Sequence, residues 1–208
     1  MQIDILVYPG FDELDVFGPL EVLRNLGKDV PAFEVKLAGF YAGNEVQASH
    51  GTRILVDKRF GEGPAADWLI VPGGGWGDRA REGAWAEVQR GIIPKALRES
   101  HERGAAMASV CTGAMLLAAA GMLKDRAAVT HHVAIEELRR TGARVMDARV
   151  VDDGDIVTCG GVTSGIDMAL WLAERFAGEE AASKIARLLE HERRGPIWTR
   201  SAAINVQG

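Results

Sequence analysis

The sequence predicts an α/β domain in which helices cover both faces of a mostly parallel sheet. Short apolar runs alternate with segments of helical period along the whole 208-residue chain. Because parallel strands need long crossover connections, this alternation is typical of such sheets. Hydrophobic residues make up 47% of the chain and charged residues 25%, as in ordinary globular proteins.

The N-terminal part of the chain predicts a strand, a helix, a second strand and a hairpin. Residues 2–8 are an apolar run that a Pro-Gly pair ends, which is typical of a strand. Residues 13–26 carry apolar side chains at helical spacing, and Gly27 is in position to cap that helix. Residues 33–40 alternate as a strand does, and residues 46–56 have a central glycine that indicates a hairpin.

The middle of the chain predicts two buried strands, each followed by a sharp turn. Residues 68–71 are a short apolar run before a glycine-rich turn, and residues 105–110 are a second such run. Residues 84–101 have helical period, and Pro94 is the point where we expect that helix to kink or split. Residues 112–120 become helical at once, with no loop after the strand.

The C-terminal part predicts one more strand, a β pair around an Asp-Gly turn, and three helices. The predicted strands cover residues 127–130, 149–152 and 156–158, and the predicted helices cover residues 131–140, 165–176 and 179–192. No linker or internal repeat marks a boundary, so we expect one domain over residues 1–208. Its core should cover about residues 2–192, followed by an irregular tail from Gly195.

Charge and cysteine content exclude several classes of function. The chain has 29 acidic and 24 basic residues, a formal net charge of -5, so we expect no nucleic-acid or membrane-binding surface. No apolar run reaches the ~18 residues of a membrane span, and the N-terminus lacks the basic region of a signal peptide. With only Cys111 and Cys159, we expect two free thiols, no metal and a cytoplasmic location.

Cys111 is the candidate nucleophile because it lies where a buried strand passes directly into a helix. Such a junction forces the residue into a strained conformation and projects its side chain over the carboxyl edge of the sheet. The helix N-terminus favours negative charge there. A thiol pKa lowered from ~8.5 to ~6 would raise the thiolate at pH 7 from about 3% to about 90%. The alternative is a core cysteine without chemistry, which is our interpretation of Cys159.

Five motifs in a fixed order resemble the ThiJ/PfpI superfamily, and within it the isonitrile hydratase branch. They extend the resemblance over about residues 3–192. The motifs are LDVFGPLEVL from Leu14, VPGGG from Val71, SVCTGAMLLAAAGML from Ser109, AVTHH from Ala128 and CGGVTSGIDMAL from Cys159.

The resemblance implies a flavodoxin-like three-layer sandwich that forms a homodimer, with the cysteine near the interface and no cofactor. It implies that Asp15 serves the Cys111 thiolate as acid and base. It also implies that backbone amides of Gly74, Gly75 and Thr112 hold a developing negative charge. The glycine turn lacks the Lys-Ser/Thr pair of a P-loop, which argues against nucleotide binding there.

Two departures from the hydratase pattern affect the expected pocket. The relatives usually read Thr-His-Trp where this chain has a second histidine, His132. The glycine turn is altered by Trp76, which either lines the site or lies on a surface turn. Protease-like relatives carry a His directly after the nucleophile, whereas Thr112 stands there in this chain, which argues against peptidase chemistry by that arrangement.

Other polar residues are weighed by their position along the sheet edge. His131 follows a strand and is either a base or hydrogen-bond donor in the pocket, or a structural cap. The resemblance places Val162 or Thr163 against the substrate, and Thr163 can also begin a helix as its N-cap. Glu13 is expected to be a solvated acid. The remaining histidines, which show no partner pattern, are His50, His101 and His191.

Three functional hypotheses follow. The first is a cysteine-dependent hydratase that converts an isonitrile to an N-substituted formamide through a thioimidate. The second is another thiol-dependent activity of the superfamily, such as a glyoxalase, deglycase or amidase-like reaction. The third is a sensor of ligands or oxidants that uses the cysteine without catalysis. A small-molecule substrate is expected for both enzyme hypotheses.

Overall fold

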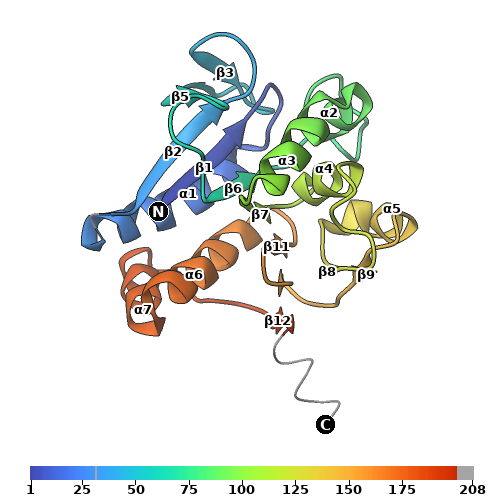
Figure 1. The fold of residues 1–208 in the computed structure, drawn as a ribbon. Helices are drawn as coiled ribbons and strands as arrows, with labels where there is room; N and C mark the ends of the chain where they lie inside the picture. Colours follow the sequence, from blue (N-terminus) through green and yellow to red (C-terminus); the bar gives the residue numbers. More distant parts are fainter. Residues whose placement is uncertain (31, 201–208) are drawn as a thin grey trace.

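The structure, a computed structural model, describes residues 1–30 and 32–200 and is built on one large sheet (Figure 1). Its strands are β1 (Gln2–Val7), β2 (Glu34–Gly39), β5 (Lys58–Arg59), β6 (Trp68–Val71), β7 (Ala106–Ser109), β10 (Val150–Asp152), β11 (Ile156–Cys159) and β12 (Ile197–Thr199). The spatial order is β12-β10-β11-β7-β6-β1-β2-β5. Only the β10–β11 pair is antiparallel among these described strands, which confirms the predicted mostly parallel sheet.

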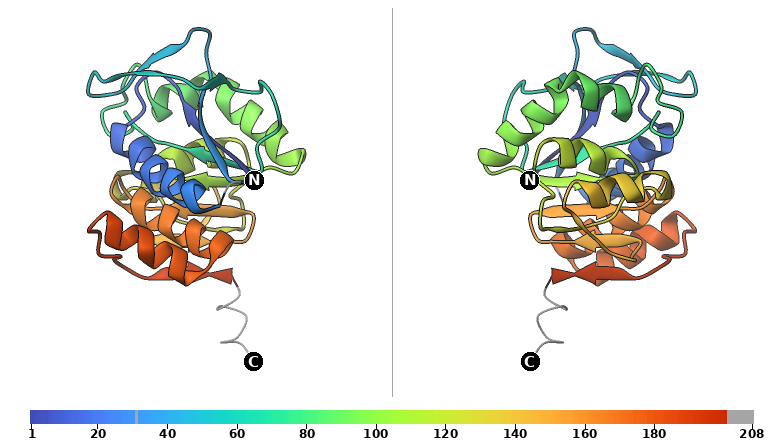
Figure 2. Two further views of the ribbon diagram at one scale, coloured as in Figure 1. Left: turned by 90° about the vertical axis from the view of Figure 1, so that its left-hand side faces the viewer. Right: turned by 90° about the vertical axis from the view of Figure 1, so that its right-hand side faces the viewer.

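Helices cover both faces of this sheet, as the two opposite views of Figure 2 show. One layer contains α1 (Glu13–Asp29), α6 (Ser164–Ala177) and α7 (Glu179–Leu188), which pack on one another. The other contains α2 (Ala84–Arg90), α3 (Ile92–Glu102), α4 (Gly113–Ala119) and α5 (Ile135–Arg140), which follows the short 3-10 helix η1 (His132–Ala134). The predicted three-layer sandwich is therefore confirmed.

Two small sheets lie outside the main one. The hairpin predicted over residues 46–56 is present as β3 (Glu45–Gln47) and β4 (Arg53–Leu55). The strand predicted at residues 127–130 is shorter, as β8 (Ala127–Ala128), and pairs with β9 (Arg144–Val145) rather than with the main sheet. A two-residue strand leaves the following residues free to turn towards the edge where Cys111 lies.

The helix boundaries correct two predictions based on glycine and proline. Gly27 lies inside α1, and Val30 caps the helix through its backbone N–H. The long helix predicted over residues 84–101 divides at Gly91, which adopts a left-handed φ of 72°. Pro94 falls in the first turn of α3, where its missing N–H has no helical partner to lose.

The irregular tail predicted from Gly195 is also wrong in part. Residues 197–199 form β12, which pairs in parallel with β10 and extends the sheet. The backbone N–H of Arg149 donates to the carbonyl of Pro196 at 3.0 Å, which starts this pairing. The short apolar sequence Ile197-Trp198 thereby supplies hydrogen-bond partners to backbone groups at the open edge of β10. The rest of the predicted tail, residues 201–208, lies outside the described residues.

The core positions the functional edge by fixing the central strands from both sides. All four residues of β6 are buried, as are Met107, Ala108 and Ser109 of β7. From α1, Val16, Leu23 and other apolar residues bury completely against the sheet. Truncation of one such leucine to alanine costs about 2–5 kcal/mol, so the core holds these strand ends in place.

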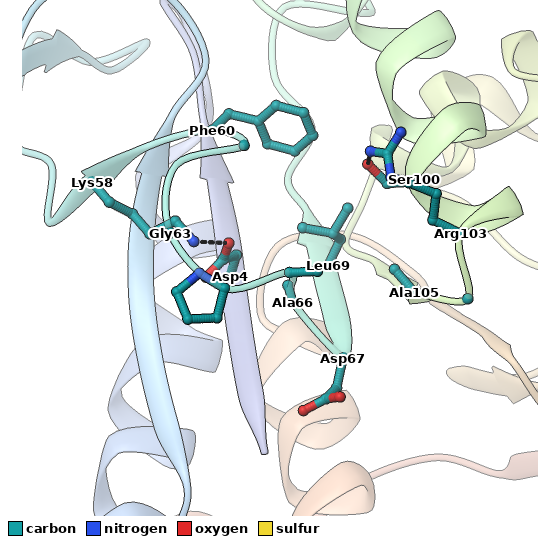
Figure 3. A pocket seen from close by; sticks show the side chains of 14 residues that line it. Asp4, Lys58, Phe60, Gly63, Ala66, Asp67, Leu69, Ser100, Arg103 and Ala105 are labelled. Carbon is teal, nitrogen blue, oxygen red and sulfur yellow. Dashed lines mark hydrogen bonds and ion pairs between the residues drawn. The ribbon is translucent and has the colours of Figure 1, made fainter.

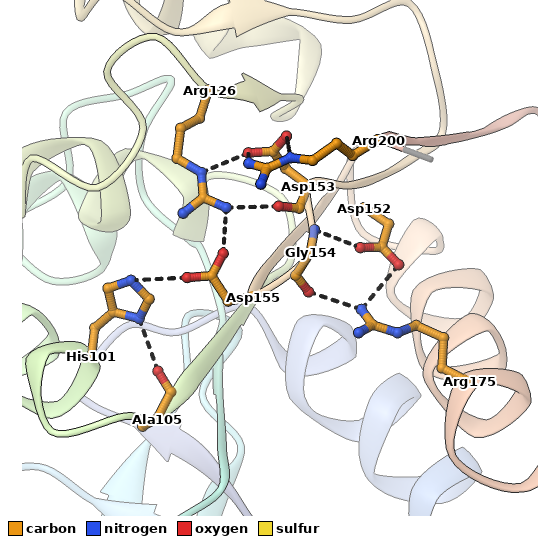
Figure 4. A network of polar contacts seen from close by, with 9 residues as sticks. All are labelled: His101, Ala105, Arg126, Asp152, Asp153, Gly154, Asp155, Arg175 and Arg200. Atoms are coloured by element: carbon orange, nitrogen blue, oxygen red, sulfur yellow. Dashed lines mark hydrogen bonds and ion pairs between the residues drawn. The ribbon is translucent and has the colours of Figure 1, made fainter. Parts of the chain in front are cut away.

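The two ends of the sheet differ in their polar groups. At the amino edge, a cavity of about 400 Å³ is bordered by a buried ion pair between Lys58 and Asp4, with Nζ and Oδ2 2.7 Å apart (Figure 3). Near the β10–β11 turn, Arg126 and Arg200 converge on Asp153 (Figure 4). At the carboxyl edge lies Cys111, directly after β7.

Candidate active site

Cys111 stands between β7 and α4 with a left-handed φ of 56°. This region is strained for a residue with a side chain. Its backbone is held at both ends: its N–H donates to the carbonyl of Gly160 at 2.9 Å, and its carbonyl accepts the hydroxyl of Thr130 at 2.8 Å. The neighbouring strand β11 and the segment after β8 therefore stabilise the turn that presents the sulfur.

Gly113 allows this turn to approach the adjacent strand. A Cβ atom at position 113 would lie 2.1 Å from the carbonyl oxygen of Val71, far inside any real contact. Position 113, two residues after Cys111, must therefore be a glycine if α4 is to begin against β6.

Asp15 is buried in the first turn of α1 and points at the same edge. Its side chain is 0% exposed, and its Oδ2 accepts the backbone N–H of Gly73 at 2.8 Å. Its Oδ1 has no hydrogen-bond partner among the described residues. Asp12 caps the helix by accepting the N–H of Leu14, which fixes where α1 begins.

Burial is the main cause that raises the pKa of Asp15 to about 8, and the nearby charge of Asp12 is the second cause. The Gly73 amide and the Cys111 thiol act in the opposite direction and lower this pKa. The thiol is thus close enough to exchange a proton with the carboxyl group. A carboxyl with a pKa near neutrality is suited to give and take protons.

The expected lowering of the Cys111 pKa is wrong in direction. The residue is 7% exposed, and burial raises its pKa to about 12, with the charge of Asp15 as the second cause. The amides of Val162 and Thr112 lower it, but they do not outweigh burial. The N-terminus of the seven-residue helix α4 is therefore weaker than desolvation. At neutral pH the resting pair holds two protons, one on sulfur and one on the carboxyl.

The three glycine amides of the turn after β6 differ in their hydrogen-bond partners. The Gly73 N–H binds Asp15, and the Gly74 N–H donates to the hydroxyl of Thr112 at 3.1 Å. The Gly75 N–H donates to no other group in the described part of the chain. The sequence resemblance assigned the amides of Gly74, Gly75 and Thr112 to a developing negative charge. The Gly74 amide already binds the Thr112 hydroxyl, and the Thr112 amide acts on the Cys111 sulfur. The Gly75 amide has no hydrogen-bond acceptor in the described residues.

The turn between β11 and α6 places Val162 beside the sulfur. Val162 has a φ of 43°, and its backbone N–H acts on the Cys111 thiol. Sequence reasoning suggested a substrate contact at Val162 or Thr163 and missed this amide. The hydroxyl of Thr163 accepts a hydrogen bond from Arg149 at 3.0 Å, and the structure does not test the substrate contact suggested for it.

His131 lies at the same edge with a defined hydrogen-bonding state. Its Nδ1 accepts the backbone N–H of Val133 at 3.3 Å, which assigns the proton of the neutral ring to Nε2. Burial lowers its pKa and keeps it neutral. A Cβ on Gly161 would lie 2.1 Å from the His131 ring, so only glycine fits there. The exposed ring of His132 stacks on His131 with centroids 4.1 Å apart.

Trp76 is buried, so it neither lies on a surface turn nor presents its ring to the solvent at the site. It is 4% exposed, and its Nε1 donates to Glu137 of α5 at 3.3 Å. Arg79 also binds Glu137 and stacks over the ring of Trp85 at 3.8 Å. These contacts fasten the glycine turn to α5, which follows His131 in the chain.

The acidic and basic residues judged isolated have partners from distant segments. Glu13 is not a solvated acid: it pairs with the ring of His50 at 2.7 Å. Burial works to raise the pKa of Glu13, but hydrogen bonds from His50 and Thr52 lower it to about 2. His101 pairs with Asp155. The sequence alone does not show these partners, because they are far apart in the chain and only folding brings them together.

The described residues contain neither a cluster that could bind a metal nor a helix that could span a membrane. No group of three or more His, Cys, Asp or Glu side chains in residues 1–30 and 32–200 could hold a metal ion. None of the helices in that part of the chain has the length and hydrophobicity to cross a membrane. The two cysteines are free thiols in the structure.

Comparison with known proteins identifies the family. The DJ-1/PfpI family profile matches residues 1–175. The chain belongs to the DJ-1/PfpI family. An isonitrile hydratase of Pseudomonas putida is 34% identical over 191 residues, which are 92% of this chain and 78% of that protein. A deglycase of Thermococcus kodakarensis is 32% identical over 160 residues, 76% of this chain and 89% of that protein.

Solved structures of DJ-1/PfpI proteins share the fold described above. The crystal structure of a ThiJ/PfpI family protein from Pseudomonas syringae has a TM-score of 0.80 and 28% sequence identity, and covers 94% of this chain and 76% of that one. Membership in the DJ-1/PfpI family supports a thiol-dependent activity. Because the relatives carry the names of different activities, membership does not select one reaction.

Proposed function

We propose that this chain is a cysteine-dependent hydratase that converts an isonitrile to an N-substituted formamide. One observation carries the proposal: a fully buried carboxyl, Asp15, keeps one oxygen without a partner in the described residues, next to the thiol of Cys111. A buried carboxyl oxygen that neither a backbone amide nor a basic side chain binds is costly, so a role in proton exchange with Cys111 is the explanation that we propose. The 34% identity to an isonitrile hydratase supports the choice of substrate.

The first step adds the thiol across a single carbon atom. The terminal carbon of an isonitrile accepts both a nucleophile and a proton. As Sγ of Cys111 bonds to that carbon, the thiol proton passes to Asp15, and Asp15 delivers it to the same carbon. One C–S bond and one C–H bond form, and the product is a thioimidate. One carboxyl suffices because the atoms that lose and gain the proton are neighbours.

The second step hydrolyses the thioimidate. Water adds to the carbon while Asp15 takes one of its protons and delivers it to the imine nitrogen, which gives a tetrahedral adduct. The C–S bond then breaks and its electron pair returns to sulfur. As the carbonyl forms, Asp15 takes the hydroxyl proton of the adduct and returns it to Cys111. The products are a formamide and the original thiol, so no oxidant, reductant or cofactor is consumed.

Two donors at the sheet edge are suited to the charge that develops on nitrogen and oxygen. The open N–H of Gly75 is fixed in a rigid turn, and the neutral His131 ring presents Nε2–H. We assign the Thr112 amide to the sulfur, where it stabilises the anion that leaves in the second step. Gly74 supports this arrangement indirectly by holding the Thr112 hydroxyl.

The test is to incubate the protein with an alkyl isonitrile and to measure formamide by mass spectrometry. The wild type should form formamide, Cys111→Ala should form none above the uncatalysed rate, and Cys159→Ala should retain activity as the matched control. A trapped adduct on Cys111 would identify the nucleophile. Equal turnover by wild type and Cys111→Ala would refute the proposal.

A second candidate is a deglycase-like activity on glycated amines or thiols. It is favoured by the 32% identity to the Thermococcus deglycase and would use the same sulfur. Parallel assays of isonitriles and of methylglyoxal adducts separate the two candidates, since each predicts turnover of one substrate class.

We further propose that the chain acts as a cytoplasmic homodimer on a small-molecule substrate, as the family resemblance implies. Sedimentation equilibrium should then give twice the 22.4 kDa mass of one chain. A monomer at micromolar concentration would contradict this part of the proposal without affecting the chemistry.

A further inference from the structure

The turn between β11 and α6 supplies one of the two backbone amides that act on the catalytic sulfur. Val162, whose N–H does so, has a φ of 43°. This left-handed conformation is unfavourable for a β-branched residue, which indicates that surrounding contacts hold it. The contacts that hold the turn therefore control where this amide lies.

Arg149 contacts the turn on both sides of Val162. Its backbone carbonyl accepts the N–H of Gly160 at 3.0 Å, and its Nη2 donates to the hydroxyl of Thr163 at 3.0 Å. The carbonyl of Gly160 in turn accepts the N–H of Cys111. Two hydrogen bonds thus link the main chain of Arg149 to that of the catalytic cysteine.

Asp167 fixes the guanidinium of Arg149. The Nε of Arg149 donates to Oδ2 of Asp167 at 2.6 Å, and Asp167 is 2% exposed. The other oxygen of Asp167 accepts Nε2 of His191 at 2.9 Å and the N–H of Arg194 at 3.2 Å. A buried carboxylate with this many donors has one position, so the segment after α7 also holds the arginine in place.

We propose that Arg149 is a positioning residue for the catalytic sulfur: braced by Asp167, it locks residues 160–163 so that the Val162 amide stays on Cys111. The inference rests on Cys111 being the nucleophile of the proposed function, but not on the identity of the substrate. The other titratable groups that act on this thiol are Asp15, Asp12, Tyr8 and Cys159. None of these four groups forms a hydrogen bond with the Arg149 side chain in the described part of the chain, and only Cys159 feels its charge.

The experiment measures alkylation of Cys111 by iodoacetamide between pH 6 and 10, in a Cys159→Ala background. Below the thiol pKa, the rate follows the thiolate fraction. Arg149→Met should slow alkylation about tenfold across this range, because the thiolate loses one of its two amide donors. Arg149→Lys should fall between, since an ammonium cannot bind Asp167 and Thr163 with the geometry of a guanidinium.

Two further variants keep the test decisive. Arg193→Met removes an arginine–carboxylate pair in the same C-terminal segment, with Glu174, but does not touch the turn, so its alkylation profile should match wild type. Thr163→Val removes only the hydroxyl contact and should slow alkylation about threefold, even if Arg149→Met does not fold. Wild-type profiles for both Arg149→Met and Thr163→Val, or equal losses in Arg149→Met and Arg193→Met, would overturn the inference.

The outcome is separable from that of the proposed function. If wild type makes no formamide but Arg149→Met still slows alkylation, the positioning role stands and the hydratase proposal fails. If wild type makes formamide and Arg149→Met alkylates normally, the hydratase stands and the positioning role is rejected.

Discussion

Asp15 and Asp153 are both 0% exposed, yet their surroundings differ completely. Asp153 receives Arg126 at 2.6 Å and Arg200 at 2.6 Å (Figure 4). Asp15 receives one backbone amide and keeps an oxygen without a partner in the described residues. Burial works to raise the pKa of both groups, but the two arginines lower that of Asp153 while that of Asp15 rises to about 8. Of two carboxyls that are closed to solvent, one is used for structure, and we propose that the other transfers protons.

The largest expected effect is on the activity of Asp15→Asn. An amide cannot carry the thiol proton to carbon, so formamide formation should fall by at least about 1,000-fold. Asp153→Asn, the same substitution at the paired carboxyl, should retain activity in proportion to its folded fraction. Steady-state kinetics with an alkyl isonitrile compares the two. Similar losses in both variants would remove the functional distinction between these carboxyls.

The second effect is on the stability of Asp153→Asn. The substitution removes the charge that two arginines bind. Because Arg200 is half-exposed and Arg126 keeps its pair with Asp155, the loss should be about 2–3 kcal/mol. Urea unfolding at pH 7 should show this loss. Because the folded pKa of Asp153 is lowered, the wild-type advantage should be present at neutral pH and disappear as pH falls below the ordinary aspartate pKa. An advantage that does not shrink between pH 7 and pH 2 would contradict the pairing.

The third effect is on the stability of Asp15→Asn, and here the substitution should stabilise the protein. The folded pKa of Asp15 is raised from 3.8 to about 8, so the wild type loses stability as pH rises between these values. Asp15→Asn escapes this loss and keeps an oxygen to accept the Gly73 amide. It should therefore be more stable than wild type by about 2 kcal/mol or more at pH 9, and nearly equal at pH 4. Urea unfolding at both pH values checks the widening gap, and a gap that does not change with pH would count against it.

The smallest effect is on the pH dependence of kcat/KM for formamide formation by the wild type, which should change by about tenfold per pH unit. The Asp15–Cys111 pair should lose its first proton near pH 8, and the state with one proton is the reactive one. The kcat/KM for formamide formation should rise with pH up to about 8 and then level. A profile that is flat from pH 6 to 8 would instead indicate a thiolate already formed at neutral pH.

The strand and helix order was predictable because it depends on local pattern. The elbow at Cys111 was predictable for the same reason, since a buried strand, a cysteine and a glycine follow one another directly. The prediction at Gly91 and Pro94 failed because both residues break helices, and only packing of α2 and α3 decides which one does.

The electrostatics of the site were not predictable from the same local pattern. A helix N-terminus lowers a thiol pKa, but the burial that overrides it comes from β11, α1 and the glycine turn meeting at one edge. The pairing of Glu13 with His50, 37 residues away, likewise depends on how the β3–β4 hairpin folds over α1. The role of Val162 lies in its backbone, and no side-chain pattern reports a backbone amide.

The β12 strand has a consequence for biosynthesis. β10 consists entirely of buried residues, and residues 197–199 are the last to leave the ribosome among those that complete the sheet. Until they emerge, β10 offers an unpaired edge to any neighbouring strand. Between translation of β10 and docking of β12, this edge is therefore open to association with another nascent chain.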